Sequence, residues 1–550
     1  MTERSPRSLW SPCALLLALT AFVAFARALG HDFLIEEDRE AVVENPLLRQ
    51  GFAPHVLEEI FVGTTSADTA LGRLSHVLVS ELFGPGPAPA HAANLALHAA
   101  NVALLFLVLA RPCGRRAALL AALAFAFHPL QLPSVTWVAS RGVLLAQLLL
   151  LLACCAFLGS RAAGRRRLLG LACAIVLASL ALVPALSSAP SLLPALPRLA
   201  RGFLWPFAHS PVPADGARGF YGMSTLLLAL LVLLGTRAAT RAPRLGKILL
   251  PLAALAPLAL LVETERLLPA WRDQGSLARA ALARDPRDGR ALQWLARDAL
   301  ERGKLTLASD LARTVLELDR EAPSAHLLLG TIALRRPRLE DAERACEAAL
   351  ALEPEAPQAN ALLGEVLFRV GDPESLSRAA EHFERALAAS PLALRALTRL
   401  SLVRIQLGDP QGAREAAGRA LEIDAENREA WLARGEAAEL TGDDQGAIAA
   451  YRKALAIEPD YAEALTQLGA HEIERGELAD ARELLERAYF VHPLFPDASF
   501  QFARCLEAQG ELDPAIRYYG IAVEQNPRNE RAKRSLAELR RQRGEGDGEH

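Results

Sequence analysis

An acidic stretch, HDFLIEEDREAVVENP, follows the first apolar run of the chain and holds the residues best suited to chemistry. Its six carboxylates are Asp32, Glu36, Glu37, Asp38, Glu40 and Glu44. A positioned carboxylate removes the proton from a hydroxyl nucleophile, and desolvation at the edge of a bilayer raises its pKa and makes it a better base. The stretch is therefore either a solvated loop or part of a site at a membrane surface.

A second set of polar residues lies in the apolar segment HAANLALHAANVALLF. His91, Asn94, His98 and Asn101 are spaced 3, 4 and 3 residues apart, which predicts one narrow stripe on a helix. Polar side chains at membrane depth face a bundle interior or a watery cavity. The stripe either joins helices by hydrogen bonds or forms the wall of a cavity beneath the acidic stretch.

Seven apolar runs would position these residues, and each approaches the roughly 20 residues that cross a bilayer as a helix. They lie at about 9–29, 92–111, 117–135, 139–158, 166–186, 220–236 and 246–263. Pro129 and Pro133 should break the third helix near its end, and Arg141 should begin the fourth.

Clusters of arginine flank alternate ends of these runs, and cytoplasmic loops carry the excess of positive charge. The clusters are Arg4/Arg7, Arg111/Arg115/Arg116, Arg161/Arg165/Arg166/Arg167 and Arg237/Arg241/Arg244/Lys247. All four fall on one side if seven helices cross from a cytoplasmic N-terminus. The acidic stretch and the C-terminal half then face outward. The first run could instead be a cleaved signal peptide, which would still leave His31 onward outside.

The charge balance divides the chain into two halves. Residues 1–263 hold 21 Lys/Arg and 13 Asp/Glu, a net of +8, whereas the rest holds 39 and 50, a net of −11. A basic apolar half followed by an acidic polar half predicts a membrane domain fused to a soluble one. The soluble part has no stripe of basic residues, so the sequence does not favour a nucleic-acid binder. The chain has no CxxC motif either, so it does not favour a zinc site.

Motif positions shared with one known family occur along the membrane half, at Asp38, Asn45–Pro46, Ser75–His76, Phe83–Gly84, Asn94, His98, Asn101, His128–Pro129, Val135, Trp137 and Arg141. At these positions the chain resembles the transmembrane and tetratricopeptide-repeat-containing O-mannosyltransferases, whose membrane domain is a GT-C glycosyltransferase. The likeness covers about residues 9–160 and, through the repeats described below, 264–542. It implies a bacterial inner-membrane enzyme that moves a sugar from a polyprenyl-phosphate donor to Ser or Thr of a protein, without a metal or other cofactor.

The resemblance also implies roles for single residues. Asp38, helped by Glu37, would be the catalytic base, and Arg141 would bind the lipid phosphate through its guanidinium. The remaining substrate-binding candidates are His91, Asn94, His98 and His128.

Several departures from the family pattern affect the same region. Glu37 replaces an Asp, Thr69–Ala70 replaces an Arg-Pro pair, Gln131–Pro133 replaces a His-Thr-Glu sequence, and Val143 replaces an acid. They favour a second hypothesis, a catalytically inactive membrane-anchored scaffold in which only the soluble half works. Transport is a weaker third reading, because no inverted repeat is visible.

The soluble half is periodic. A proline or its substitute recurs every 34 residues, with one interval of 37, at Pro286, Arg320, Pro354, Pro391, Ala425, Pro459, Pro493 and Pro527. This period is typical of tetratricopeptide repeats, which stack helix pairs into a solenoid. We expect the three additional residues to lengthen a turn within VGDPESLSR (370–378).

The fold class predicted is therefore all-α, a seven-helix GT-C-like bundle followed by a tetratricopeptide solenoid. The domains are 1–263 with an outer loop at 30–91, a linker or half-repeat at 264–285, seven repeats at 286–528, and a capping helix with a polar tail at 529–550. First helices of the repeats should line a groove for a protein or peptide partner. Its exposed positions are predicted to include Phe368, Leu432, Glu436, Glu439, Phe500, Arg504 and Glu507. Ordinary solvated residues are the alternative.

Overall fold

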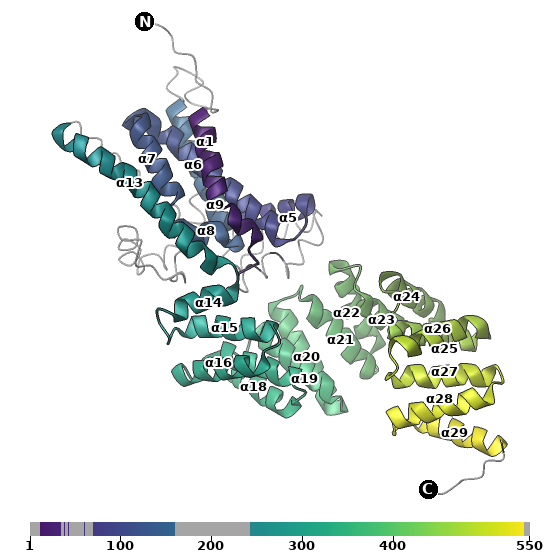
Figure 1. Ribbon diagram of the computed structural model, residues 1–550. Helices are drawn as coiled ribbons and strands as arrows, with labels where there is room; N and C mark the ends of the chain where they lie inside the picture. The colour runs from purple at the N-terminus through teal and green to yellow at the C-terminus, as the bar shows by residue number, and fades with distance from the viewer. Residues whose placement is uncertain are drawn as a thin grey trace. The chain divides into compact units, whose positions relative to one another are not determined.

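The computed structural model describes residues 12–34, 70–159 and 243–543, together with the single positions 38, 42 and 60. All elements within these ranges are helical, as predicted (Figure 1). The chain divides into two compact units, residues 1–325 and 326–550. Each unit is described by itself below.

Among the described residues, the first unit contains three helices of 19 to 27 residues and several shorter ones. Its elements are α1 (Pro12–Ala24), η1 (Ala26–Gly30), α5 (Ala70–Phe83), α6 (Pro87–Cys113), α7 (Arg115–Ala126), η3 (Pro129–Gln131), α8 (Leu132–Thr136), η4 (Val138–Ser140), α9 (Arg141–Gly159), α13 (Pro243–Leu267), η7 (Leu268–Trp271), α14 (Gln274–Leu282), α15 (Gly289–Glu301) and α16 (Leu305–Leu318). The helix α5 lies in the region predicted as an outer loop.

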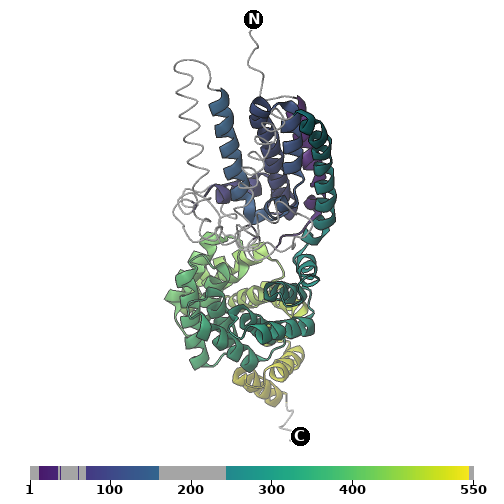
Figure 2. The same cartoon turned by 90° about the vertical axis from the view of Figure 1, so that its left-hand side faces the viewer.

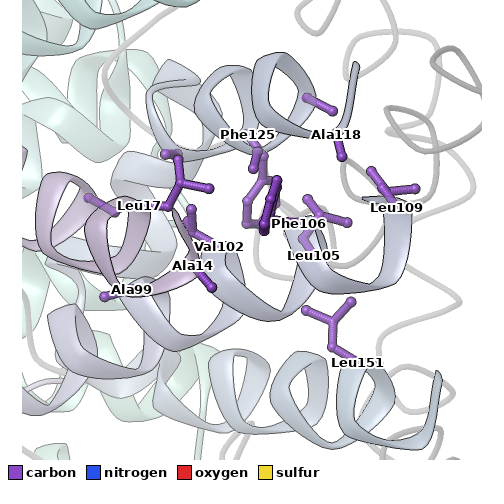
Figure 3. Packing of buried hydrophobic residues seen from close by; sticks show 14 of the residues in the cluster. Ala14, Leu17, Ala99, Val102, Leu105, Phe106, Leu109, Ala118, Phe125 and Leu151 are labelled. Atoms are coloured by element: carbon purple, nitrogen blue, oxygen red, sulfur yellow. The ribbon is translucent and has the colours of Figure 1, made fainter. Parts of the chain in front are cut away.

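An apolar core joins α1, α6, α7 and α9, which run side by side in both views (Figures 1 and 2). Leu17 of α1 and Phe125 of α7 pack against Val102 and Phe106 of α6, and Leu151 of α9 closes the cluster (Figure 3). These side chains follow the helical period in sequence, so each helix buries one apolar stripe against its neighbours. The core therefore fixes the positions of the polar residues on α6.

The third apolar run is broken, as its two prolines predict. Helix α7 ends at Ala126, and the segment Pro129–Thr136 continues at an angle of 55° to it. Proline has no N–H and clashes with the preceding turn, so the ladder of helical hydrogen bonds stops. The break leaves backbone carbonyl groups without helical partners inside the bundle.

The described residues contain fewer candidate spans than the seven predicted. Two helices are long and apolar enough to cross a membrane, Pro87–Cys113 and Val138–Leu158, and the bent pair 115–136 would make a third. Helix α1 has only 13 residues. The predicted runs at 166–186 and 220–236, the four arginines at 161–167, and Glu37 lie outside the described residues.

The start of the periodic region packs onto the apolar helices within the first unit. Leu268 and Trp271 of η7 and Leu277 of α14 share one buried cluster with Phe25 and Trp137. The compact unit therefore continues past residue 263, because the segment Leu267–Trp271 shortly beyond it is apolar and joins the buried cluster.

The second unit is a stack of helix pairs closed by a single helix (Figure 1). Its elements are α17 (Pro323–Arg335, which begins at the unit boundary), α18 (Leu339–Leu352), α19 (Pro357–Val370), α20 (Pro373–Ala389), α21 (Leu394–Gln406), α22 (Pro410–Ile423), α23 (Arg428–Leu440), α24 (Asp444–Ile457), α25 (Ala462–Glu474), α26 (Leu478–Val491), α27 (Pro496–Ala508), α28 (Leu512–Gln525) and α29 (Glu530–Gln542).

Small residues let the two helices of a repeat approach closely. At Gly364 of α19 a Cβ would meet the Phe383 ring of α20 at 3.0 Å. Gly371 ends α19 with a φ of 75°, a backbone conformation that side chains other than that of glycine rarely adopt. Asp372 then accepts hydrogen bonds from the first N–H groups of α20.

The three additional residues of this repeat lengthen a helix and not a turn, which corrects the prediction. Helix α20 has 17 residues, whereas α18 and α22 each have 14. Alanine, glutamate and arginine dominate its sequence, and these residues favour helix over loop.

Candidate functional site

Asp38 lies at the centre of a buried polar network in the first unit. Its side chain is fully buried and accepts hydrogen bonds from the backbone N–H of Leu34 at 3.0 Å and of Ala139 at 2.6 Å. Burial raises the pKa of Asp38 to about 7, although the N–H groups of Ala139, Leu34 and Val138 and the Arg141 charge oppose the shift. The carboxylate thus caps N–H groups at the start of the segment that leads into α9.

Arg141 begins α9, as predicted, and is also fully buried. Its Nε donates to the Asn94 side-chain oxygen at 2.9 Å, and its Nη2 and Nη1 donate to the carbonyls of Ala90 at 2.9 Å and Ser75 at 3.3 Å. The Nδ2 of Asn94 donates in turn to the Trp137 carbonyl at 3.0 Å. Asn94 therefore links Arg141 to the broken segment between α7 and α9.

The other members of the α6 stripe also donate to backbone carbonyls. Nε2 of His98 lies 3.2 Å from the Ala126 carbonyl, and Nδ2 of Asn101 lies 3.0 Å from that of Leu144. His91 reaches the Asp32 carbonyl at 3.4 Å. The carbonyls of Ala126 and Trp137 flank the break, and a buried carbonyl without a partner destabilises the fold by a few kcal/mol. The stripe thus joins helices, the first of the two readings.

His128 has a local role, because its Nδ1 accepts a hydrogen bond from the Leu130 N–H at 3.2 Å and caps the short helix η3. Thr264 of α13, which the sequence reasoning missed, donates to the Phe127 carbonyl at 2.7 Å. Thr264 stands between two glutamates just past the end of an apolar run and belongs to no repeating pattern, so only its position beside the break identifies it.

A hollow of about 250 Å³ opens beside this network. It is lined by Arg27, Gly30, His31, Leu268, Pro269 and Arg272. Neither Asp38 nor Arg141 lines it, and Arg27 forms an ion pair with Glu265 at 3.1 Å. Asp38 and Arg141, the predicted catalytic base and phosphate-binding residue, are therefore brought together in one buried network. Their hydrogen-bond partners there are mainly backbone groups.

The second candidate site is the inner face of the second unit, which we define as the surface of the first helices α19, α21, α23, α25 and α27. Helices α19, α21 and α23 contact one another in sequence, as do α25 and α27. Leu432 is only 5% exposed and packs with Ile448 and Tyr451, so it belongs to the core and not to this face. Phe368 and Phe500 are half-buried against their own repeats.

Tyrosines of the second helices hold two of the predicted acids in place. The Tyr451 hydroxyl donates to Glu439 at 2.9 Å, and the Tyr519 hydroxyl donates to Glu507 at 2.6 Å. Each carboxylate raises the pKa of its tyrosine, in addition to burial. Arg504 lies near the second pair and donates to Gln501 at 2.8 Å.

Glu436 is the most perturbed acid of the inner face. Burial, together with the charges of Glu439 and Glu463, raises its pKa to about 7, while a hydrogen bond with Gln467 opposes the shift. Two carboxylates three residues apart on a helix repel each other.

Comparison with known proteins decides the identity of this half. Two families, both described as tetratricopeptide repeats, match the chain. The matched residues are 295–357, 338–392, 374–427 and 398–462 for the first, and 438–489 and 472–539 for the second. The C-terminal half is a tetratricopeptide repeat solenoid.

Solved structures with the same repeats cover parts of the chain. A tetratricopeptide repeat protein from Parabacteroides merdae is 18% identical over 46% of this chain and 98% of its own, with a TM-score of 0.39. YrrB, described as a TPR protein with an unusual peptide-binding site, is 21% identical over 34% and 95%, with a TM-score of 0.31. A thermophilic TPR protein from Thermus thermophilus is 24% identical over 34% and 98%, with a TM-score of 0.30. No curated protein sequence matches the chain significantly.

Proposed function

We propose that the chain is a membrane-anchored protein whose tetratricopeptide solenoid binds a segment of a partner protein. The observation that carries this proposal is the array itself, which places the first helices of successive repeats on one inner face with charged and half-buried aromatic side chains. Tetratricopeptide arrays present such surfaces to extended peptides or helices.

The apolar helices support the anchor. Helix α6 and the segment Val138–Leu158 have the length and composition to cross a bilayer, and Asn94 and Asn101 of α6 donate to backbone carbonyls, as lipid requires of buried polar groups. In this proposal the seven-span topology and the arginine distribution place the N-terminus in the cytoplasm and the array outside a bacterial inner membrane.

Selection from a random 12-residue peptide library on the purified full-length chain in detergent tests the binding activity. The same chain with Phe368→Ala and Phe500→Ala, which truncates two half-buried aromatic side chains of the inner face, is the comparison. Enrichment of sequences that bind the wild type and lose affinity for the variant supports the proposal. A library from which no sequence binds either chain contradicts it.

Extraction of isolated membranes with alkaline carbonate tests the anchor. A chain held by spanning helices stays in the membrane pellet, because removing their apolar surface from lipid is strongly unfavourable. Release of most of the protein into the supernatant would contradict the anchor and leave the binding proposal untouched.

Glycosyl transfer from a polyprenyl-phosphate sugar to protein Ser or Thr is a second candidate function. It is favoured by the full burial of Asp38, which raises its pKa to about 7, because a base whose pKa lies near the working pH removes a hydroxyl proton efficiently. In this candidate Asp38 turns from its backbone partners toward the acceptor, Glu37 assists it, and Arg141 binds the phosphate. The lipid-linked sugar is then a substrate, and neither a metal nor a cofactor takes part.

Glycopeptide mass spectrometry of cells that lack the gene tests the transferase candidate. The cells are complemented with wild type, with Glu37→Gln/Asp38→Asn, or with Asp32→Asn as the control for an exposed acid of the same stretch. The transferase candidate is supported if hexose disappears from defined Ser or Thr sites in the deletion strain and in the double variant, but stays in the wild type and in Asp32→Asn. Identical glycopeptides in all four strains rule it out and leave the scaffold.

A further inference from the structure

The groups that face one another between α23 and α25 form what we name the acidic corner: Glu436, Glu439, Glu463 and His471. Glu436 and Glu439 lie one turn apart on α23, and Glu463 and His471 come from α25. Glu439 and Glu463 both repel the charge of Glu436, and Gln467 of α25 hydrogen-bonds to it. All these residues lie within the second unit; Glu436, Glu439 and Glu463 lie on its inner face, and His471 is buried beside them.

The arginines near this corner form ion pairs with other acids. Arg428 pairs with Glu458 and covers the Tyr461 ring at 5.2 Å. Arg452 and Arg475 both pair with Glu472, at 3.4 and 3.2 Å. Within residues 326–543 no arginine or lysine pairs with Glu436, Glu439 or Glu463, so the corner keeps an excess of negative charge.

A buried ring nitrogen also faces the corner without a hydrogen bond. His471 is 6% exposed, and its Nε2 makes no hydrogen bond in the structure. This atom lies 3.8 Å from the nearest Glu439 carboxylate oxygen, beyond hydrogen-bond length, while that oxygen is held by Tyr451. A buried polar atom without a partner is destabilising, and a ligand that supplies one relieves the cost.

An equivalent site in a later repeat of the same chain contains a cation. Two repeats later, at a spacing of 504 − 436 = 68 residues, Arg504 takes the place of Glu436, while Glu507 and Tyr519 repeat the Glu439–Tyr451 pair. The Arg504 charge offsets the negative charge around Tyr519. In that repeat the chain supplies its own cation, whereas in the acidic corner a second carboxylate occupies the equivalent position.

We infer that the acidic corner binds a lysine or arginine side chain of the partner segment. An ammonium group has three N–H donors, and the carboxylates of Glu436 and Glu439 together with Nε2 of His471 provide three acceptors. Glu463 adds charge at the same end of the site. The inference rests on the proposed peptide binding and specifies which chemical class the inner face selects.

Sequencing of the peptides selected by full-length chains tests this inference. Wild type is compared with Glu436→Gln/Glu439→Gln and with Glu415→Gln/Glu483→Gln, which removes two exposed acids from the second helices α22 and α26. We expect wild type and control to enrich Lys or Arg at one position, and the corner variant to lose that enrichment. Replacing this residue by Gln in a selected peptide should weaken binding to wild type about 10- to 100-fold, as expected for charge-assisted hydrogen bonds.

A further variant, Glu436→Arg, reproduces the arrangement at Arg504. It keeps the test independent of folding defects, because the chain itself then supplies the missing cation. It should fold, as judged by circular dichroism, and select peptides without basic residues. Peptides that bind all four chains with no preference for Lys or Arg would overturn the inference but keep the proposed function. Absence of any selected peptide would overturn both.

Discussion

Single residues of this protein show how burial sets the state of a carboxylate. Burial is the largest cause of the pKa of about 7 at both Asp38 and Glu436, but the other groups around the two carboxylates differ. Asp38 is fully enclosed and accepts N–H groups of the backbone, whereas Glu436 is partly exposed and faces other acids. The Asp38 carboxylate therefore stabilises a backbone conformation, whereas the Glu436 carboxylate adds negative charge to the acidic corner.

Glu436→Gln should change the stability of the array in a pH-dependent way. The pKa of Glu436 is about 7 in the folded chain against 4.5 for the free group, so the folded state binds this proton more tightly than the unfolded state does. The contribution of Glu436 to stability is thus most favourable below pH 4.5 and is lost as the pH rises to 7. We expect the variant to be more stable than wild type by about 1–3 kcal/mol at pH 8 and equal to it at pH 4.

Urea unfolding followed by fluorescence at both pH values measures this difference. Trp431, the only tryptophan among residues 326–550, lies on the same helix as Glu436 and reports on it locally. Equal stabilisation at both pH values would mean that the carboxylate charge is not the cause.

Asp38→Asn should destabilise the first unit. The carboxylate accepts from two backbone N–H groups, and an amide offers one oxygen and turns an NH₂ toward the other donor. We expect a loss of about 1–3 kcal/mol in the thermal unfolding of the detergent-solubilised chain. Asp32→Asn, at an exposed position, should leave the transition within about 0.5 kcal/mol of wild type. Equal stability of both variants would contradict the structural role of Asp38.

Helices of the two units are held by different means. In the first unit, polar side chains of α6 satisfy the carbonyls that the break between α7 and α9 exposes. In the second unit, glycines of three first helices bring paired helices together, and a large side chain of the second helix lies over each of them, at Gly364–Phe383, Gly435–Tyr451 and Gly469–Leu485. Close approach at these three positions consequently depends on the absence of a Cβ.

Gly364→Ala should destabilise the array by about 1–3 kcal/mol, because its Cβ would press on Phe383 at 3.0 Å. Gly418→Ala is the matched control, since nothing lies within 4 Å of its Cβ and alanine favours the interior of α22 by about 1 kcal/mol. Opposite shifts of the urea midpoint, read from Trp431, are expected. Phe383→Leu added to Gly364→Ala should recover part of the loss, and a midpoint unchanged by Gly364→Ala alone would refute the close approach.

For the whole molecule, the proposed membrane anchor predicts on which side of a membrane the repeats lie. In our proposal the array lies outside, and labelling of a single cysteine tests it. Lys533→Cys, placed on the half-exposed surface of α29, should react with a membrane-impermeant maleimide in intact spheroplasts above the wild-type background. Cys346 and Cys505 are buried and contribute little to that background. Labelling that appears only after lysis would place the array in the cytoplasm.

The sequence by itself determined the parts of this protein that follow from local patterns. The 34-residue period predicted the solenoid, because each repeat carries small residues and residues that become buried at the same positions. Pro129 and Pro133 predicted the break after α7, and Arg141 marked the first residue of α9, since both depend on backbone chemistry that neighbours hardly change.

Only the tertiary structure decided what the polar residues do. Asp38 meets Ala139 across 101 residues of chain, and Asn94, His98 and Asn101 of α6 find their carbonyl partners 28 to 43 residues further on. A spacing in sequence places residues on one face of a helix but does not say which groups the fold brings to that face. The acidic corner is a similar case, because Glu436 becomes a charge without a counterion only when α25 adds Glu463 beside it and the nearby arginines pair with Glu458 and Glu472. Electrostatic partners are set by distance in space, and distance in space is a property of the packed helices.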